Sequence, residues 1–142
     1  MTIVDTSFLY ALLDSRETDH ARAAAWVQAA DPELVTTPLI LSEADHLARR
    51  RGGKHAVDRF RAEVADGALE VEWSPAIVAP MMQVAETYRG LDISLDDASL
   101  VALAAHLHTT KIATFDERHF RAMRPLTGEP AFTLLPADAP AG

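Results

Sequence analysis

The sequence contains no cysteine, and this absence excludes several kinds of site at once. A disulfide scaffold, a zinc finger, an iron–sulfur cluster and a thiol nucleophile all require that residue. The sequence also lacks an apolar run of membrane-spanning length, and residues 1–5 lack the basic start and long apolar stretch of a signal peptide. We therefore expect a cytoplasmic protein that does not associate with membranes.

Basic residues are also scarce, with 13 Lys and Arg against 21 Asp and Glu and a net charge of −8. Taken whole, this is not a composition typical of nucleic-acid binding, which depends on many cations. The basic residues are unevenly placed, however, because the stretch 49–61 contains Asp58 as its only acid. We interpret this stretch either as a solvated helix end or as a set of phosphate contacts. The candidate residues for contacting the phosphates of a nucleic acid are Arg49, Arg50, Arg51 and Lys54.

The length and composition are those of an ordinary globular protein, with 142 residues, of which 49% are hydrophobic and 24% charged. We expect a single domain over residues 1–136 and a disordered tail over 137–142. Apolar runs predict strands at 2–4, 33–36, 69–73, 111–115 and 132–135. Helical patterns cover 8–13, 20–30, 38–51, 54–65, 76–88 and 95–108, with a break at Gly52-Gly53.

This alternation of strands and helices predicts an α/β fold. We expect three α/β/α layers, with a central, mostly parallel sheet of four to five strands covered by helices. In such sheets, functional groups gather beyond the carboxyl ends of the strands. Asp5 and Asp116 both directly follow a predicted strand, so they are candidate site residues. Each could equally be the N-cap of a following helical turn.

Two further acids fall on helical surfaces that otherwise face the core. Glu43 shares an arc with Leu39 and Leu47, where an unpartnered charge is costly, although it could also lie at the edge of that stripe. Asp97 lies on a helix that is apolar nearly all round, and a capping box from Ser94 explains it as well. Helix geometry alone does not choose between Asp96 and Asp97. If the acids converge, they repel one another unless protons or cations such as Mg²⁺ or Mn²⁺ neutralise them.

The residues around these acids resemble those of PIN-domain ribonucleases. The similar segments are Val4-Asp5-Thr6-Ser7-Phe8-Leu9, Ser42-Glu43 with Leu47, Asp97-Ala98 with Leu100 and Ala102, and Thr114-Phe115-Asp116-Glu117-Arg118-His119-Phe120. The length and the ending 132–136 look like the VapC toxins of type II toxin–antitoxin systems, and the resemblance covers nearly the whole chain. It implies a PIN-like fold and an acidic quartet of Asp5, Glu43, Asp97 and Asp116. Asp97 is preferred over Asp96 because the family acid precedes alanine, and Ser7 and Thr114 match supporting hydroxyl positions.

By this resemblance, we expect an endoribonuclease that depends on Mg²⁺ or Mn²⁺. Asp5 and Asp97 would ligate the ion, Glu43 would ligate or act as a general base, and Asp116 would hold a second ion or a water. The expected partners are an RNA substrate, a cognate antitoxin protein and a second copy of the chain in a homodimer. A groove near Phe8, Leu9 and Leu12 is our expected antitoxin site. The alternative is a catalytically silent PIN-like module that binds RNA or protein.

Overall fold

Five short parallel strands form the sheet of the computed structural model, which describes residues 1–140. The strands are β1 (Thr2–Val4), β2 (Leu34–Thr36), β3 (Glu70–Val71), β4 (Lys111–Ala113) and β5 (Thr133–Leu135). Their order is β3-β2-β1-β4-β5, and every neighbouring pair is parallel. Ile3 of the central strand β1 therefore lies between Val35 and Ile112. The predicted α/β class and parallel sheet are confirmed.

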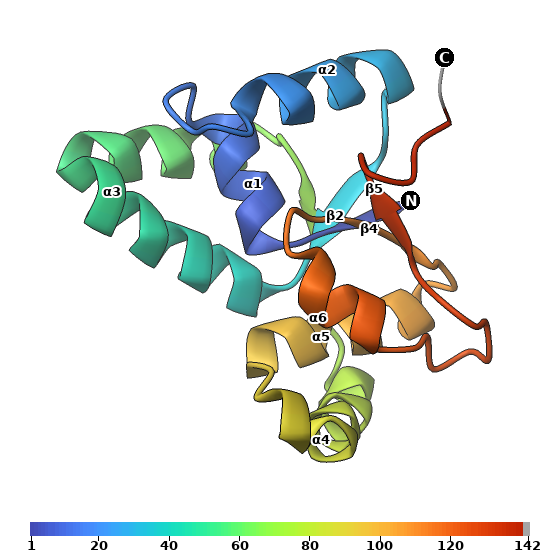
Figure 1. The fold of residues 1–142 in the computed structure, drawn as a ribbon. Helices are drawn as coiled ribbons and strands as arrows, with labels where there is room; N and C mark the ends of the chain where they lie inside the picture. The colour runs from blue at the N-terminus through green and yellow to red at the C-terminus, as the bar shows by residue number, and fades with distance from the viewer. Residues whose placement is uncertain (141–142) are drawn as a thin grey trace.

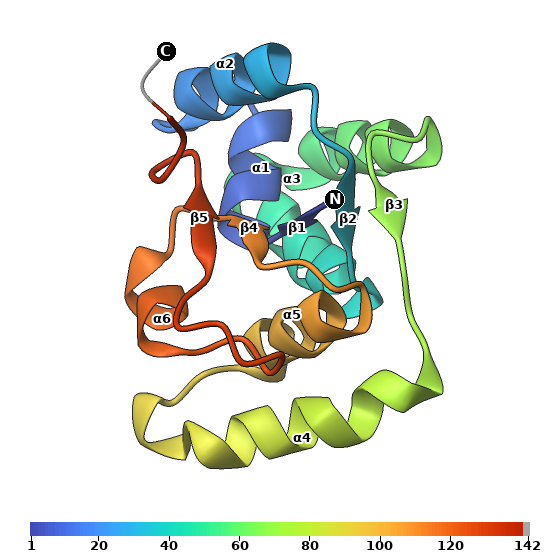
Figure 2. The same ribbon diagram turned by 90° about the vertical axis from the view of Figure 1, so that its right-hand side faces the viewer.

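Helices cover both faces of this sheet (Figure 1). They are α1 (Thr6–Leu13), α2 (His20–Ala30), α3 (Pro38–Ala65), α4 (Val78–Thr87), α5 (Leu95–His106) and α6 (Glu117–Ala122), with short 3-10 helices η1 (Pro75–Ile77) and η2 (Arg89–Leu91). Figure 2 shows α1 and α2 on one side of the sheet and α5 and α4 on the other, with α4 packed on α5. The arrangement is the expected three-layer one. No helix along the described part of the chain has both the length and the apolar character needed to cross a membrane.

Helix α5 is buried on nearly every side, from Asp97 to Ala104. It contacts β1 on one side and α4 on the other, so no face of this segment is left to solvent. This explains why its sequence is apolar nearly all round rather than amphipathic. Burying a large aliphatic side chain such as Leu100 or Leu103 contributes roughly 1.5 to 3 kcal/mol relative to leaving it exposed. The helix that carries Asp97 is therefore firmly seated against the sheet.

Helix α3 starts and bends where the sequence predicts. Thr37 caps it by accepting a hydrogen bond from the Ile40 amide, and Pro38 occupies its first turn. The expected break appears as a kink at Gly53, whose φ of 66° lies in the left-handed region. The kink lets the two arms turn toward each other, and Arg61 donates two hydrogen bonds to the Asp45 carboxylate, at 2.7 and 3.0 Å.

The structure differs from the sequence prediction at three places. The predicted strand 69–73 is a two-residue edge strand whose residues Glu70 and Val71 are both exposed, so its covered face is missing. Helix α6 was not predicted. The expected disordered tail instead begins with a turn at 136–138, where Asp138 accepts a 2.8 Å hydrogen bond from the Leu134 amide and pairs with Arg121 at 2.7 Å. The last part of that tail, 141–142, lies outside the described residues.

Candidate active site

A pocket of about 450 Å³ opens beyond the carboxyl ends of β1 and β4. It is lined by all four acids of the predicted quartet, which are Asp5, Glu43, Asp97 and Asp116. Asp96 lines it as well. The sheet brings two of them together, because β1 and β4 are neighbours and the Asp5 amide donates to the Ala113 carbonyl at 3.0 Å. Residues far apart in sequence thus meet at one sheet edge, as the strand-end rule predicts.

Asp5 is buried, with 5% of its surface exposed, and both of its carboxylate oxygens accept hydrogen bonds. Oδ1 accepts from the Thr6 amide at 2.7 Å, so Asp5 is also the N-cap of α1. Oδ2 accepts from the hydroxyls of Thr114 at 2.7 Å and Ser7 at 3.0 Å. Burial raises the pKa of Asp5, while these hydrogen bonds act in the opposite direction. Asp5 is therefore a helix cap that also lines the pocket, so the two alternatives for it do not exclude each other.

The same two hydroxyls fix the backbone that follows β4. Ser7 Oγ accepts from the Phe115 amide at 2.9 Å, and Thr114 Oγ1 accepts from the Asp116 amide at 2.9 Å. Each hydroxyl donates to Asp5 and accepts from the segment that carries Asp116. The position of Asp116 is consequently tied to that of Asp5 through Ser7 and Thr114.

Asp97 enters the pocket from the first turn of α5, where the Ser94 hydroxyl accepts a 3.2 Å hydrogen bond from its amide. It is 9% exposed. Burial, followed by the charges of Asp5 and Asp116, raises the pKa of Asp97 to about 7, against a lowering effect of His119. Burial first, and then repulsion from the neighbouring acids, thus favours the protonated form of Asp97 up to a pH near neutrality.

His119 lies directly beside this cluster, and sequence reasoning missed it. Its Nδ1 is 3.1 Å from Asp116 Oδ2 and 3.4 Å from Asp97 Oδ2. Asp116 is the N-cap of α6 and accepts from the His119 amide at 3.5 Å, which places the imidazole on the first turn beside its own cap. The spacing Asp116-x-x-His119 was the available signal, since residues three apart on a helix are neighbours.

Glu43 differs from its expected position. The buried face of its helix carries Ile40 and Ala44, whereas Glu43 is exposed and lies on the pocket wall. The stripe-edge alternative is the correct one. Asp96, which helix geometry could not separate from Asp97, also lines the pocket. Burial and then the neighbouring Glu43 charge raise the pKa of Asp96, so Glu43 and Asp96 add to the negative potential there.

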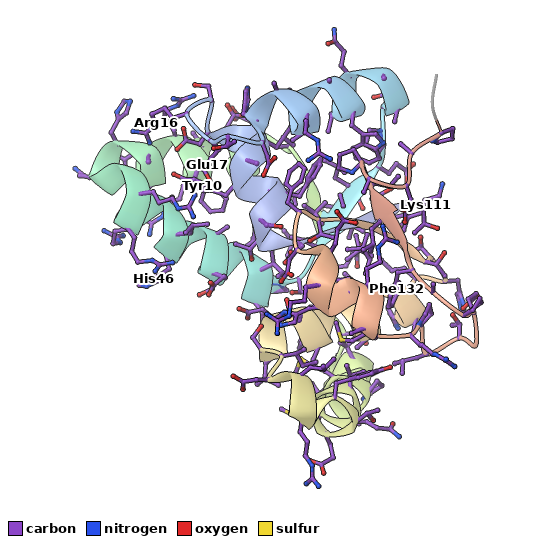
Figure 3. All side chains as sticks on the ribbon, viewed as in Figure 1. Tyr10, Arg16, Glu17, His46, Lys111 and Phe132 are labelled. Carbon is purple, nitrogen blue, oxygen red and sulfur yellow. The ribbon has the colours of Figure 1, made fainter. Side chains whose placement is uncertain are left out.

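Of the four basic residues proposed for RNA, Arg51 lines the pocket, whereas Arg49, Arg50 and Lys54 do not. The Arg51 guanidinium donates to the Glu17 carboxylate and lies 5.7 Å from the centre of the Tyr10 ring. Figure 3 shows Tyr10 and Glu17 beside α3, where Arg51 ends the arm before the kink. The structure therefore brings one cation to the acidic pocket.

The expected antitoxin groove near Phe8, Leu9 and Leu12 is wrong for two of its three residues. Phe8 and Leu9 are 0% and 1% exposed, so they belong to the core. The Phe8 ring stacks on Phe115 at a centroid distance of 5.5 Å and meets Trp26 edge-on at 5.6 Å. Phe8 and Leu9 therefore offer no surface to a partner.

The donor set suits a divalent cation. One donor atom each from Asp97, Asp116 and His119 lies within 4.8 Å of the others. Within the part of the chain that the structure describes, His119 Nδ1 is buried without a hydrogen bond of good geometry. Carboxylate oxygens are ligands that Mg²⁺ and Mn²⁺ prefer, and a buried unpaired polar atom needs a partner. An ion among these three residues would satisfy both the excess negative charge and the unpaired nitrogen.

The fold agrees with the comparisons to known proteins. The model of the PIN domain family matches residues 2–124, and the chain belongs to that family. It is 35% identical over 135 residues to Ribonuclease VapC26 of Mycobacterium tuberculosis (strain ATCC 25618 / H37Rv), across 94% of this chain and 99% of that protein. This likeness places the chain with the VapC ribonucleases and confirms the resemblance found in the sequence.

Solved structures share the fold at lower identity. The crystal structure of Mycobacterium tuberculosis VapC20, a sarcin-ricin loop cleaving toxin, aligns with a TM-score of 0.71 at 24% identity, covering 83% of this chain and 92% of that one. A toxin–antitoxin complex from Klebsiella pneumoniae aligns with a TM-score of 0.65 at 20% identity, covering 88% and 94%. VapBC2 from Rickettsia felis, bound to a DNA fragment from their promoter, also gives 0.65, at 11% identity and the same coverage.

Proposed function

We propose that this chain is a metal-dependent endoribonuclease and the toxin of a toxin–antitoxin pair. The observation that carries the proposal is the convergence of Asp5, Glu43, Asp97 and Asp116 on one pocket at the sheet edge. The name of its curated relative, a ribonuclease, supports the substrate class. All four positions of the quartet are acidic, which favours an active enzyme over the silent binding module.

The catalytic residues are assigned to the four acids. A bound Mg²⁺ or Mn²⁺ would activate water and stabilise the charge that develops on the scissile phosphate. Asp97 and Asp116 supply ligand oxygens, with His119 beside them. Asp5 fixes the position of Asp116 through Ser7 and Thr114 and has one oxygen left with spare acceptor capacity. Glu43, exposed on the pocket wall, is placed to take a proton from the attacking water.

Arg51 is the first choice for contact with the RNA backbone. Its guanidinium lines the pocket and is held by a carboxylate, Glu17, which an incoming phosphate can replace. Arg49, Arg50 and Lys54 would extend this contact away from the pocket as a basic rim.

The proposed partners are an antitoxin protein and a second copy of the chain, acting in the cytoplasm. An antitoxin is supported by the structural neighbours, which include a toxin–antitoxin complex. The homodimer rests on the family resemblance, and the cytoplasmic location is the expectation drawn above from the sequence. Co-expression with the neighbouring reading frame, followed by native mass measurement, would detect both the antitoxin and the dimer.

The test of the activity is RNA cleavage by the purified chain with Mg²⁺ or Mn²⁺, compared with the same reaction in EDTA. We expect cleavage that EDTA abolishes and that Asp5→Asn reduces by at least about a hundredfold, because a ligand or positioning charge is lost. Asp31→Asn is the matched control, since Asp31 is exposed and lies in the left-handed region that asparagine tolerates. RNA binding without metal-dependent cleavage would instead favour the silent module.

A further inference from the structure

His119 brings a nitrogen donor to a site otherwise built from carboxylates. Its Nδ1 is buried and lacks a well-oriented hydrogen bond among the described residues, although two carboxylate oxygens lie 3.1 and 3.4 Å away. A polar atom that is buried, close to two acceptors and still poorly paired is unusual in folded proteins. This arrangement fits an atom whose intended partner is an ion between it and the carboxylates.

Two of the three separations between the donor atoms agree with that interpretation. Adjacent ligands of an octahedral ion, each at about 2.1 Å from it, are about 3.0 Å apart. Nδ1 stands 3.1 Å from Asp116 Oδ2 and 3.4 Å from Asp97 Oδ2, close to this value. Asp5, by contrast, has one oxygen that already accepts from two hydroxyls, so it is less free to join the same set.

The element that carries His119 is also fixed. Helix α6 starts at the Asp116 cap, and Phe120 next to His119 is 1% exposed. The helix is held at its other end by Arg121, which pairs with Asp138 at 2.7 Å. The helix that carries the imidazole is therefore fixed by its cap, by packing and by ion pairing, and a rigid element of this kind favours a well-placed metal ligand.

We propose that Nδ1 of His119 directly ligates the ion held by Asp97 and Asp116, and that this nitrogen shifts the site's preference from Mg²⁺ toward first-row transition-metal ions such as Mn²⁺. Mg²⁺ is bound through oxygen, whereas imidazole is a good ligand for transition metals. The inference rests on the proposed function only in taking this pocket as a divalent-metal site. It adds a nitrogen ligand to the carboxylate oxygens of the acidic quartet.

Calorimetric titration of the full-length, metal-free protein with Mg²⁺ and with Mn²⁺ tests the preference. We expect the wild type to bind Mn²⁺ at least about tenfold more tightly than Mg²⁺. His119→Gln offers an oxygen in place of the nitrogen, so it should weaken Mn²⁺ about tenfold and leave Mg²⁺ within about threefold. His46→Gln is the control, because His46 is exposed and projects from α3 away from the pocket (Figure 3).

A spectroscopic measurement tests the bond itself and needs no variant to fold. Electron spin-echo modulation of the Mn²⁺-loaded wild type should show a directly coordinated ¹⁴N nucleus. The signal should disappear in His119→Gln and persist in His46→Gln. A wild type with bound Mn²⁺ but no ¹⁴N coupling, or an unchanged Mn²⁺-to-Mg²⁺ ratio in His119→Gln, overturns the proposal.

Neither measurement contains RNA, so the two proposals fail in different ways. If the protein shows the ¹⁴N coupling but cleaves no RNA, the proposal of a His119 ligand stands and the proposal of a ribonuclease fails. If it cleaves RNA with Mn²⁺ but lacks the coupling, the ribonuclease proposal stands and the ligand proposal fails. Absence of any divalent-metal binding overturns both.

Discussion

Replacing Asp97 with asparagine removes a buried charge while keeping the size of the side chain. In the folded protein the pKa of Asp97 is raised to about 7 from a usual value of 3.8. The folded state therefore binds more protons than the unfolded state between these two values. Without metal, this carboxyl lowers the stability of the wild type as the pH rises from about 4 to 7, and the full penalty is present above that range.

The size of the effect follows from the shift. A shift of one pH unit corresponds to about 1.4 kcal/mol, so the penalty at pH 8 has a ceiling of about 4 kcal/mol. Between pH 5 and pH 8 the wild type should lose about 2 to 3 kcal/mol from this group. Asp97→Asn should be spared that loss, because its amide does not ionise.

The assay is urea unfolding in EDTA at pH 5 and pH 8, followed by circular dichroism, for the wild type and Asp97→Asn. The substitution should raise the free energy of unfolding by about 2 to 3 kcal/mol more at pH 8 than at pH 5. Saturating Mn²⁺ should stabilise the wild type, by about 2.7 kcal/mol at a hundred times Kd, and stabilise the variant much less. Asp31→Asn controls for a general loss of negative charge. Equal gains at the two pH values would refute the crowding of carboxylates around Asp97.

Three further outcomes are expected. Thr114→Val keeps the shape of the side chain but removes the hydroxyl between Asp5 and Asp116, so it should lower the free energy of unfolding in urea by about 1 to 3 kcal/mol and lower the rate of RNA cleavage. Wild-type values in both assays would show that the hydroxyl does not position the acids. Gly53→Ala should lower the free energy of unfolding by about 1 kcal/mol, and with it the thermal midpoint, because Gly53 has a left-handed φ. Gly90→Ala, where the added methyl group meets open space, should leave the thermal midpoint unchanged. Equal midpoints for the two variants would contradict strain at the kink. Arg51→Ala, made in an inactive Asp5→Asn background, should reduce the slope of log Kd for single-stranded RNA against log salt concentration by about 0.7, because one phosphate contact is lost. An unchanged slope would show that Arg51 does not contact the RNA.

The sheet edge could be predicted because parallel strands leave little freedom. Once residues 2–4 and 111–115 are assigned to strands of one parallel sheet, Asp5 and Asp116 must lie at the same edge. An acid at the start of α5 could be predicted because a charge in that apolar helix stands out, but only the family resemblance preferred Asp97 over Asp96, and both line the pocket. Both acids that follow strands are also helix caps, so the two explanations that the sequence left open for each residue coexist.

What the sequence did not predict depends on contacts over long distances. Helix α6 has six residues, too few for a periodic pattern, and its position depends on packing of Phe120 and pairing of Arg121 with Asp138. His119 was missed together with it. Of the two alternatives for Glu43, the core-facing one is wrong because α3 leaves that part of its surface open to the pocket rather than covered by the core.

The hydrogen bond between Thr114 and Asp5 spans 109 positions of the chain. A growing polypeptide therefore carries Asp5 long before Thr114, and the Asp5 carboxylate has only its local partners Thr6 and Ser7 until the segment through α6 has left the ribosome. Copies that terminate before residue 114 contain neither the hydroxyl of Thr114 nor Asp116 and His119. For a protein whose activity would harm the cell that makes it, this order of synthesis delays any hazard until residues 114–119 have been made.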